Sequence, residues 1–278
     1  ALVELKKQGY DVIGVTMQIW QDEDNEVQEE NGGCCGLSAV DDARRVASSI
    51  GIPYYVMNFK QEFQKNVIDY FTEEYLNGRT PNPCIACNRY VKWEALLQRS
   101  LSIGADYIAT GHYARVEHHE GKDSVMLKGI DQNKDQTYFL CQLNQKQLQA
   151  SLFPLGNITK QEVRKIAEEL DLPVAHKKDS TGICFIGERD FKQFLQNYIP
   201  AKPGKMVDIQ TGKVIGDHIG IMYYTIGQRK GLGISNKVPL FVVGFNYEKN
   251  EVIVGEQKDL YKKEIEVEDI NLLLVDKI

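Results

Sequence analysis

This 278-residue chain has no long apolar runs and few cysteines. No apolar stretch approaches the roughly 20 residues that a membrane-spanning helix needs, so we expect no membrane span. The first ten residues are typical of the end of an amphipathic helix rather than of a signal peptide. The six cysteines, without secretory features, indicate a reducing, cytoplasmic location, where cysteines are more often catalytic or metal-binding than disulfide-bonded.

Both ends of the chain lie inside expected elements of secondary structure. Residue 1 falls within a helix that no strand precedes, and the apolar run 270–275 is a strand without partners. We therefore expect a fragment of a longer protein.

The net charge of −6 argues against a general nucleic-acid coat, but the charge is unevenly distributed. Residues 171–240 carry ten Lys and Arg against six Asp and Glu. Six further acids lie within residues 22–30, where we expect a solvated loop. The alternative is that these acids contact a basic partner.

Apolar strands alternate with helices over the first 110 residues. Strands are expected at 12–17, 52–59 and 106–110, and helices at 2–9, 39–50 (with Ser38 as its cap), 61–76 and 88–103. This order predicts an α/β fold with a parallel sheet and helices on both faces. Ligands bind such sheets at the carboxyl ends of strands, where Met17, Gly111 and His112 fall.

The last predicted helix of the α/β part begins at a capping box at 159–162 and runs to residue 170. After about residue 194 the sequence pattern changes. Frequent glycines then divide short apolar runs, which is typical of short strands and turns. We predict an α/β catalytic domain over 1–194, a small β-rich domain over 195–262 and the start of a β-barrel over 263–278.

The segment 82–88, NPCIACN, contains a C-x-x-C motif formed by Cys84 and Cys87. Such a motif is compatible with a redox pair, two metal ligands or a nucleophile with a helper thiol. The chain has no second C-x-x-C and no H-x-x-x-H, and the adjacent Cys34 and Cys35 have poor chelate spacing, so we expect no structural zinc. The prolines at 81 and 83 stiffen the approach to the motif.

A second thiol, Cys184, lies in the segment 179–187, DSTGICFIG, which predicts a turn. Nearby cations, expected to be Lys177, Lys178 and Arg189, favour a reactive thiolate. We expect no catalytic role for Cys34 and Cys35, and a core position for Cys141.

Three further polar segments have both a structural and a functional interpretation. The segment Lys134, Asp135 and Gln136 is a surface turn before an apolar run. The glycine-rich basic turn 224–233 is either a plain hairpin or a nucleic-acid contact. In the second case it would bind a phosphate backbone, and Tyr224 would stack on a base. His112 alone is more typical of a loop histidine with satisfied hydrogen bonds.

Taken together, these segments closely resemble the bacterial tRNA-specific 2-thiouridylases. The matching pieces occur in family order: RTPNPCIACNRYVKW, ATGHYARV, KDQTYFL, KKDSTGICFIGERDF and YYTIGQRKGLGI. The resemblance implies a PP-loop adenine-nucleotide α-hydrolase fold, with the ATP-binding loop just before Ala1. It implies replacement of the C2 oxygen of uridine 34 in tRNA by sulfur, with ATP and Mg²⁺.

The resemblance also implies the roles of individual residues. Met17 and Gly111 would contact ATP, and the tRNA contacts would be Asn82, Pro83, Cys84, His112, Lys134, Asp135 and Gln136. Cys184 would carry a persulfide delivered by a sulfur-relay protein or cysteine desulfurase. Cys87 would attack the activated base or release sulfide from Cys184, leaving a Cys87–Cys184 disulfide. We expect a monomer without a dedicated protein metal site.

One position departs from the family pattern, because many members have Asp where this chain has Cys84. Three thiolates, from Cys84, Cys87 and Cys184, could ligate an iron–sulfur cluster with one open iron. The same thiolation would then depend on a cluster. A non-catalytic tRNA-binding protein and a PP-loop ATPase that adenylates a small molecule are two further hypotheses for this chain.

Overall fold

The computed structural model describes residues 1–19, 37–179, 182–186 and 191–275 and divides into two compact units. Unit 1 comprises Ala1–Ile68, Pro83–Glu188 and Ile270–Ile278, and unit 2 comprises Asp69–Asn82 and Arg189–Asp269. Cys34, Cys35 and the acidic stretch 22–30 lie outside the described residues, so the loop expected there stays a prediction.

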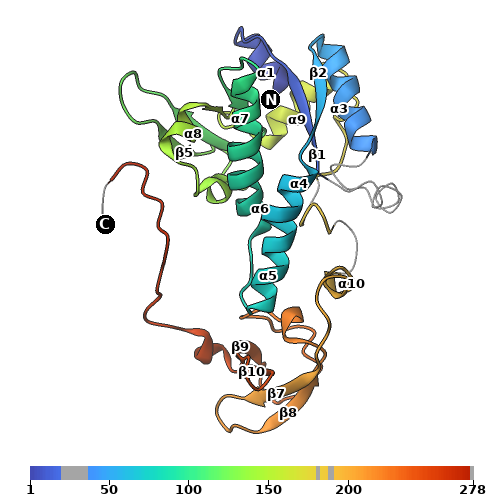
Figure 1. Ribbon diagram of the computed structural model, residues 1–278, viewed down its shortest axis with the longest axis vertical. Coiled ribbons are helices and arrows are strands. Elements are labelled where there is room, and N and C mark those ends of the chain that lie inside the picture. The colour runs from blue at the N-terminus through green and yellow to red at the C-terminus, as the bar shows by residue number, and fades with distance from the viewer. Residues whose placement is uncertain (20–36, 180–181, 187–190, 276–278) are drawn as a thin grey trace. The chain divides into compact units, whose positions relative to one another are not determined.

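A strand–helix–strand arrangement opens unit 1 (Figure 1). Its elements are α1 (Leu2–Lys7), β1 (Gly14–Gln18), α3 (Leu37–Ile50) and β2 (Tyr54–Asn58). Strands β1 and β2 pair in parallel, with Gly14 opposite Tyr54, and α3 packs against both. The expected helix and the expected parallel pairing are confirmed here, although α3 begins at Leu37, two residues earlier than predicted, so Ser38 lies inside it.

Two long helical stretches follow, each with a π-helical part, a feature frequent at functional sites. The first consists of α4 (Lys60–Phe63), η2 (Gln64–Asp69) and α5 (Tyr70–Leu76), and the second of α6 (Pro83–Ala86), η3 (Cys87–Leu96) and α7 (Leu97–Ser102). The second begins at Pro83, so the predicted start at Asn88 is wrong. Proline is well tolerated at the first helical position because its missing N–H would have no partner there.

Short strands and helices complete unit 1. They are β3 (Ile108–Ala109), β4 (Ala114–Glu117), β5 (Val125–Lys128), η4 (Thr137–Leu140), α8 (Gln145–Gln149), β6 (Ser151–Leu152) and α9 (Lys160–Glu169). Strands β3 and β6 pair in parallel, whereas β4 and β5 form an antiparallel hairpin. The predicted buried strand 106–110 is shorter than expected, and only Ile108 of β3 is buried. The capping box that starts α9 is confirmed, with Thr159 and Glu162 bonded reciprocally.

The buried core of this part surrounds Trp93 of η3. It comprises Trp93, Leu97, Ile108, Ala114, Leu140, Leu143, Leu148 and Phe153. The indole Nε1 donates to Ser151 Oγ at 2.6 Å, and that hydroxyl donates to the Gln147 carbonyl, also at 2.6 Å. Burial of the indole therefore leaves no unsatisfied donor, and it fixes the helix that begins with the C-x-x-C motif.

Unit 2 is built on a four-stranded sheet in the order β8-β7-β10-β9. Its elements are α10 (Phe191–Gln196), β7 (Gly204–Asp208), β8 (Val214–His218), η5 (Ile221–Tyr223), β9 (Phe241–Asn246), β10 (Glu251–Gly255) and η6 (Gln257–Leu260). Phe71 and Tyr75 of α5 pack edge to face against Phe191 of α10, with ring centroids 6.4 and 5.7 Å apart. The short strands expected after residue 194 are confirmed.

The α/β class is therefore confirmed, with parallel and antiparallel pairs mixed. Within the described residues, the strands form three two-stranded sheets and one four-stranded sheet rather than a continuous parallel sheet. Residues 261–275 form neither helix nor strand, and Asn271 Nδ2 donates to the carbonyls of Cys141 and Leu143. No described helix combines the length and the apolar character that crossing a lipid bilayer requires.

Candidate active site

The C-x-x-C motif occupies the start of the second helical stretch. Cys84 lies in α6 and Cys87 is the first residue of η3, and both side chains are half-buried. Residues three apart on a helix share a face, so the two thiols lie on one side of it. Pro81 and Pro83 are buried at the approach, and Asn82 between them is half-buried.

Asn88, next to Cys87, is a feature that the sequence motif did not reveal. Its side chain is 3% exposed, and Nδ2 donates to the carbonyl of Phe139 at 2.9 Å. Its Oδ1 has no hydrogen-bond partner in the described part of the chain. A buried acceptor without a partner is costly, so this oxygen is an unusual feature of the residue that follows Cys87.

Cys184 lies in a turn whose downstream end is buried. Gly182 adopts φ +93°, Cys184 is half-buried, and Phe185 and Ile186 are 1% and 6% exposed. The Phe185 ring packs edge to face on Phe63 of α4 with centroids 5.8 Å apart. Helix α4 also packs against η3, the ten-residue element that begins at Cys87, so α4 contacts both the Cys184 segment and η3.

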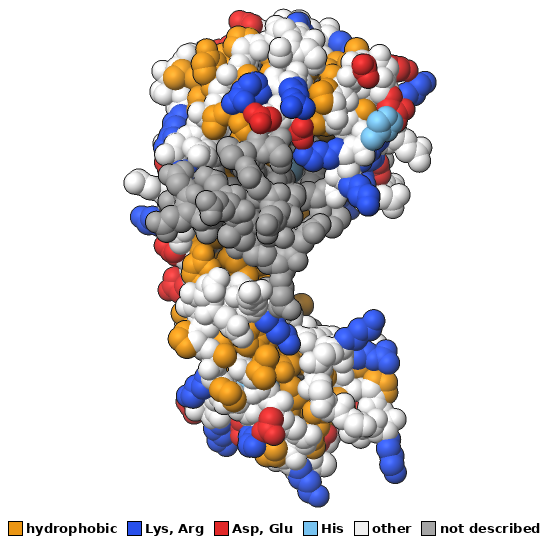
Figure 2. Space-filling model, turned by 90° about the vertical axis from the view of Figure 1, so that its right-hand side faces the viewer, with side chains coloured by type: hydrophobic (Ala, Val, Ile, Leu, Met, Phe, Trp, Pro, Cys, Tyr) orange, Lys and Arg blue, Asp and Glu red, His pale blue; other side chains and the backbone are white. Residues whose placement is uncertain are grey.

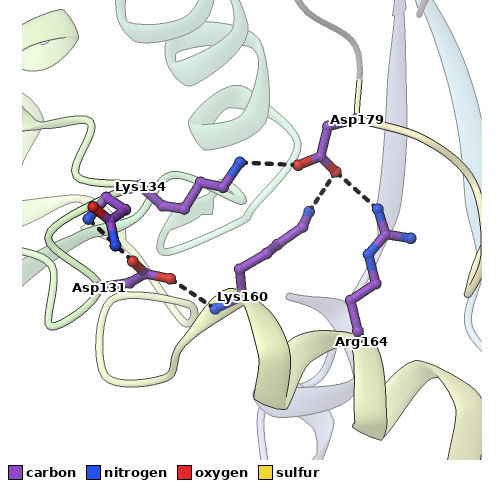
Figure 3. Close-up of polar contacts among 6 residues, drawn as sticks. Asp131, Lys134, Lys160, Arg164 and Asp179 are labelled. Atoms are coloured by element: carbon purple, nitrogen blue, oxygen red, sulfur yellow. Dashed lines mark hydrogen bonds and ion pairs between the residues drawn. The ribbon is translucent and has the colours of Figure 1, made fainter.

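Lys177 and Lys178, two of the cations expected near Cys184, are exposed, and their proximity to the thiol stays a prediction. Lys177 forms an ion pair with Asp42 of α3 at 2.6 Å, and Arg189 lies outside the described residues. Three different cations, Lys134, Lys160 and Arg164, surround Asp179, the first residue of the DSTGICFIG motif (Figure 3). Lys160 and Arg164 are one turn apart on α9, so the capping box was the sequence signal that could have placed them on one face.

The Asp179 carboxylate accepts from all three cations. Oδ1 lies 2.8 Å from Lys160 Nζ and 3.0 Å from Arg164 Nη2, and Oδ2 lies 3.1 Å from Lys134 Nζ. Hydrogen bonds from Lys160 and then Lys134 lower the pKa of this carboxyl to about 2. It is therefore ionised at any physiological pH.

The residues expected to contact ATP lie at the ends of strands. Met17 is the next-to-last residue of β1 and is half-buried, and Gly111 follows β3 by two residues and is exposed. Both positions are those at which parallel strands present ligand contacts. This placement fits a nucleotide, while the contacts themselves stay predictions.

His112 is a core residue and not an exposed contact. It is 9% exposed, its Nδ1 lies 2.7 Å from Thr110 Oγ1, and its ring centroid is 5.7 Å from that of Trp93. Burial, reinforced by the charge of Lys92, lowers its pKa to about 3. The imidazole is therefore neutral at pH 7 and carries no charge toward a polyanion.

The segment 134–136, called the KDQ loop below, is held in place by hydrogen bonds of its own side chains. Asp135 Oδ1 accepts from Gly129 N at 2.9 Å, and Asp135 Oδ2 accepts from Thr137 Oγ1 at 2.7 Å. Gln136 exchanges two hydrogen bonds with the backbone of Tyr113. Asp135 and Gln136 therefore shape the loop, and Lys134 presents an exposed charge.

The glycine-rich basic turn of unit 2 is well ordered by hydrogen bonds. Gln228 N donates to the Thr225 carbonyl at 2.9 Å, and Gly227 and Gln228 both bond to Val242 of β9. Tyr224 is 7% exposed, so its ring is not free to stack on a base as predicted, whereas Arg229 and Lys230 are exposed. In the face drawn in Figure 2, Lys and Arg side chains are spread over unit 2 among fewer acidic ones.

Two further predictions concern cysteines and metals. Cys141 is exposed, so its predicted core position is wrong; the buried residues beside it are Leu140 and Leu143. Among the described residues, no three His, Cys, Asp or Glu side chains lie close enough together to hold a metal ion. Cys84, Cys87 and Cys184 are all described and belong to no such group, and the iron–sulfur hypothesis stays a prediction.

Family models of tRNA-modifying proteins match both parts of this two-unit chain. A family model described as the tRNA methyl transferase HUP domain matches residues 1–188, and one described as the tRNA methyl transferase PRC-barrel domain matches residues 192–256. A curated tRNA-specific 2-thiouridylase MnmA from Lachnoclostridium phytofermentans is 57% identical over 275 residues, which cover 98% of this chain and 77% of the relative.

Two more relatives carry the same name. The protein from Clostridium perfringens is 53% identical over 276 residues, covering 99% of this chain and 76% of the relative. The protein from Acetivibrio thermocellus is 52% identical over 277 residues, covering 99% and 77%. The chain therefore belongs to the tRNA-specific 2-thiouridylase family.

Proposed function

We propose that this protein is a tRNA-uridine 2-sulfurtransferase, which replaces the C2 oxygen of uridine 34 with sulfur in an ATP-dependent reaction. The observation that carries this proposal is the identity of 52–57% over nearly the whole chain to relatives named tRNA-specific 2-thiouridylase. The packing of α4 against Phe185, next to Cys184, and against η3, which begins at Cys87, supports it. The matching family models are named for methyl transfer to tRNA, which agrees on the substrate but not on the reaction.

In the proposed chemistry, ATP adenylates the C2 oxygen of the uracil, so that this oxygen can leave as part of AMP. Cys184 carries a persulfide supplied by a sulfur-relay protein or a cysteine desulfurase. The Cys87 thiolate attacks the inner sulfur of that persulfide, breaks its S–S bond and releases hydrosulfide, which displaces AMP from C2. The two thiols are oxidised to a Cys87–Cys184 disulfide, and a thiol reductant must reduce it before the next cycle. In a second version, the Cys87 thiolate displaces AMP from C2, and the outer sulfur of the Cys184 persulfide then displaces Cys87. The released Cys87 thiolate attacks the inner sulfur, which leaves 2-thiouridine and the same Cys87–Cys184 disulfide.

The proposed ATP contacts are Met17 and Gly111. Their positions at the carboxyl ends of strands β1 and β3 support this assignment. Mg²⁺ would neutralise the ATP phosphates, and no step of the proposed chemistry runs through it.

The proposed tRNA contacts differ in what they can offer. Lys134 has an exposed side chain whose ammonium is paired with Asp179, whereas Asp135 and Gln136 would act by shaping its loop. His112 is neutral, so it would contribute shape and not charge. Asn82, Pro83 and Cys84 would meet the target base at the start of α6, next to Cys87. The base would have to leave the anticodon stack to reach them.

The remaining predictions are part of the same proposal. Residues 1–194 would form the catalytic domain, 195–262 a β-rich tRNA-binding domain and 263–278 the start of a C-terminal barrel. The protein would act in the cytoplasm as a monomer. The alternative is a version of the same thiolation that depends on an iron–sulfur cluster at Cys84, Cys87 and Cys184.

The test is mass spectrometry of nucleosides from tRNA incubated with the full-length protein, ATP, Mg²⁺ and a sulfide source. We expect 2-thiouridine at position 34 with the wild type and with Cys141→Ala, an exposed thiol outside the site. Cys87→Ala and Cys184→Ala should each lose the product when sulfur is supplied as persulfide.

Three outcomes contradict the proposal. Methylated uridine formed with a methyl donor would favour the reaction named by the family models. Unmodified tRNA that binds equally well to wild type and Cys184→Ala would favour a non-catalytic tRNA-binding protein. AMP release stimulated by a small metabolite rather than by tRNA would favour a different PP-loop ATPase.

A further inference from the structure

One carboxylate of unit 1 is shared by three cations from two separate segments. Lys134 comes from the loop before η4, whereas Lys160 and Arg164 come from the first turns of α9 (Figure 3). The neighbouring Asp131 uses its Oδ2 for the backbone N–H of Lys160 at 3.0 Å and its Oδ1 for that of Asn133 at 3.1 Å. Asp179 is therefore the side chain to which all three cations are bonded.

Asp179 lies at the start of the segment that carries Cys184, five residues before the thiol. Arg164 fixes the chain at two points, because Nη1 donates to the Ala175 carbonyl at 2.7 Å and Nη2 to Asp179 at 3.0 Å. Downstream of the thiol, burial of Phe185 and Ile186 fixes the opposite end. Along the chain, Cys184 thus lies between an electrostatic attachment, the ion pairs of Asp179, and an apolar attachment, the buried Phe185 and Ile186.

One of the ion pairs of Asp179 connects the Cys184 segment to the KDQ loop. Lys134 Nζ donates to Asp179 Oδ2 at 3.1 Å, and the loop of Lys134 is fixed to the Tyr113 backbone through Gln136. The ammonium of Lys134 is therefore bonded to the Cys184 segment in the protein without tRNA. A tRNA phosphate that bound Lys134 would compete with Asp179 for it.

We propose that Asp179 is a positioning residue for sulfur transfer, which fixes the Cys184 segment relative to the KDQ loop through its three cationic partners. This inference rests on the proposed role of Cys184 as the sulfur carrier. It predicts a separation of kinetic effects. Loss of the carboxylate would misplace the thiol and slow the chemical step, and it would leave Lys134 free to bind tRNA.

The test compares the full-length wild type with Asp179→Asn, Asp179→Glu and Asp208→Asn. Asp208 is a matched control, because its carboxylate also accepts several hydrogen bonds, from Gln210 and Thr211, but it lies in unit 2. The first readout is kcat and KM for tRNA in 2-thiouridine formation. The second is the rate of Cys184 alkylation by iodoacetamide without tRNA or ATP, measured by peptide mass spectrometry.

We expect Asp179→Asn to lower kcat by about tenfold to a hundredfold, the range in which a small misplacement of reacting groups acts. Its KM for tRNA should stay equal or fall, and its Cys184 alkylation rate should change severalfold. Asp179→Glu should recover most of kcat, since it keeps the charge. Asp208→Asn should match the wild type in both readouts.

Unchanged kcat and unchanged alkylation in Asp179→Asn would overturn the proposal. A raised KM for tRNA with unchanged kcat would overturn it as well, because the cluster would then belong to the tRNA-binding surface alone. If Asp179→Asn does not fold, Lys160→Gln and Arg164→Gln each remove one cation and should give smaller changes of the same sign. Failure of the proposed function is seen separately, as thiolation that survives Cys184→Ala, whereas the alkylation readout needs no activity.

Discussion

The two proposed catalytic cysteines are positioned by opposite means. Cys87 begins a π-helical stretch and is followed by the buried Asn88, and the same helix carries the core residue Trp93. Cys184 lies in a turn without regular secondary structure, between the ion pairs of Asp179 and the buried Phe185. A helix fixes its side chains through its own hydrogen bonds, whereas a turn depends on attachments at its ends.

The difference between a cysteine on a helix and a cysteine in a turn suits the proposed roles of Cys87 and Cys184. A persulfide carrier must meet a sulfur donor and then the tRNA, so a segment with two separable attachments can shift between partners. The receiving thiol must remain beside the target base, which favours a rigid helix start. The two cysteines should therefore respond differently to the loss of packing, to acid and to the loss of charge.

The largest effect is expected from the apolar attachment of the Cys184 segment. Phe185→Ala removes a ring that is 1% exposed and packed on Phe63, and it should lower the free energy of unfolding by about 3–5 kcal/mol. Urea denaturation measures this change. The control Leu101→Ala removes an exposed side chain of α7 and should cost less than about 0.5 kcal/mol.

The same variant sharpens the comparison between the two thiols. At urea concentrations where the protein stays folded, Phe185→Ala should raise the alkylation rate of Cys184 and leave that of Cys87 unchanged. Equal acceleration at both cysteines would show that the two segments are positioned as one body.

Low pH should destabilise the core around Trp93, on the helix that begins at Cys87, because the buried His112 packs on that side chain. Burial lowers the pKa of His112 to about 3, from an ordinary value of 6.5 in the unfolded chain. The unfolded state therefore takes up the proton first, so stability is lost as the pH falls from 6.5 toward 3. Relative to His112→Gln, the wild type should lose up to about 1.4 kcal/mol per pH unit below pH 6.

Urea denaturation of both proteins between pH 7 and pH 4 measures this difference. The Asp179 cluster should not contribute over that range. Its carboxyl pKa is lowered to about 2, so its contribution is present above the unfolded value of 3.8 and is lost only as the pH falls toward 2. Parallel pH profiles for the wild type and His112→Gln would contradict the assignment of His112 as a buried neutral residue.

The smallest effect is expected from one cation of the Asp179 cluster. Arg164→Gln leaves Lys134 and Lys160 in place, and partly exposed ion pairs contribute about 0.2–1 kcal/mol, so thermal unfolding should change little. The difference from wild type should shrink at high salt, which screens exposed charges. A large loss of stability that persists at high salt would mean that Arg164 acts mainly through its hydrogen bond to the Ala175 carbonyl.

Local signals predicted much of the architecture. The apolar stripe of α3, the capping box of α9 and the glycines at positive φ after α1 and α3 depend on residues a few positions apart, so they can be recognised in the chain itself. The start at Pro83 was missed because a proline ahead of a polar segment is equally typical of a turn and of a helix start.

The burial of individual side chains and their hydrogen-bond and ion-pair partners were predicted less well, because both depend on segments far apart in sequence. Tyr224 is buried and Cys141 exposed, contrary to their local composition. Lys177 pairs with Asp42, 135 positions away, and not with the Cys184 segment. Buried Asn88 bonds to Phe139, 51 positions away, which no local pattern indicates.

The sequence by itself determined the helix α3, the capped start of α9, the first two strands and the two cysteine motifs that place this chain in its family, because these depend on short-range spacing. The tertiary structure decided which charges meet. Asp179 is 45 positions from Lys134, and only the folded chain brings this carboxylate within 3.1 Å of Lys134 and of two residues of α9. Ion pairs act over a few ångströms, so the partners of Asp179 depend on the packing of the KDQ loop and α9 around it.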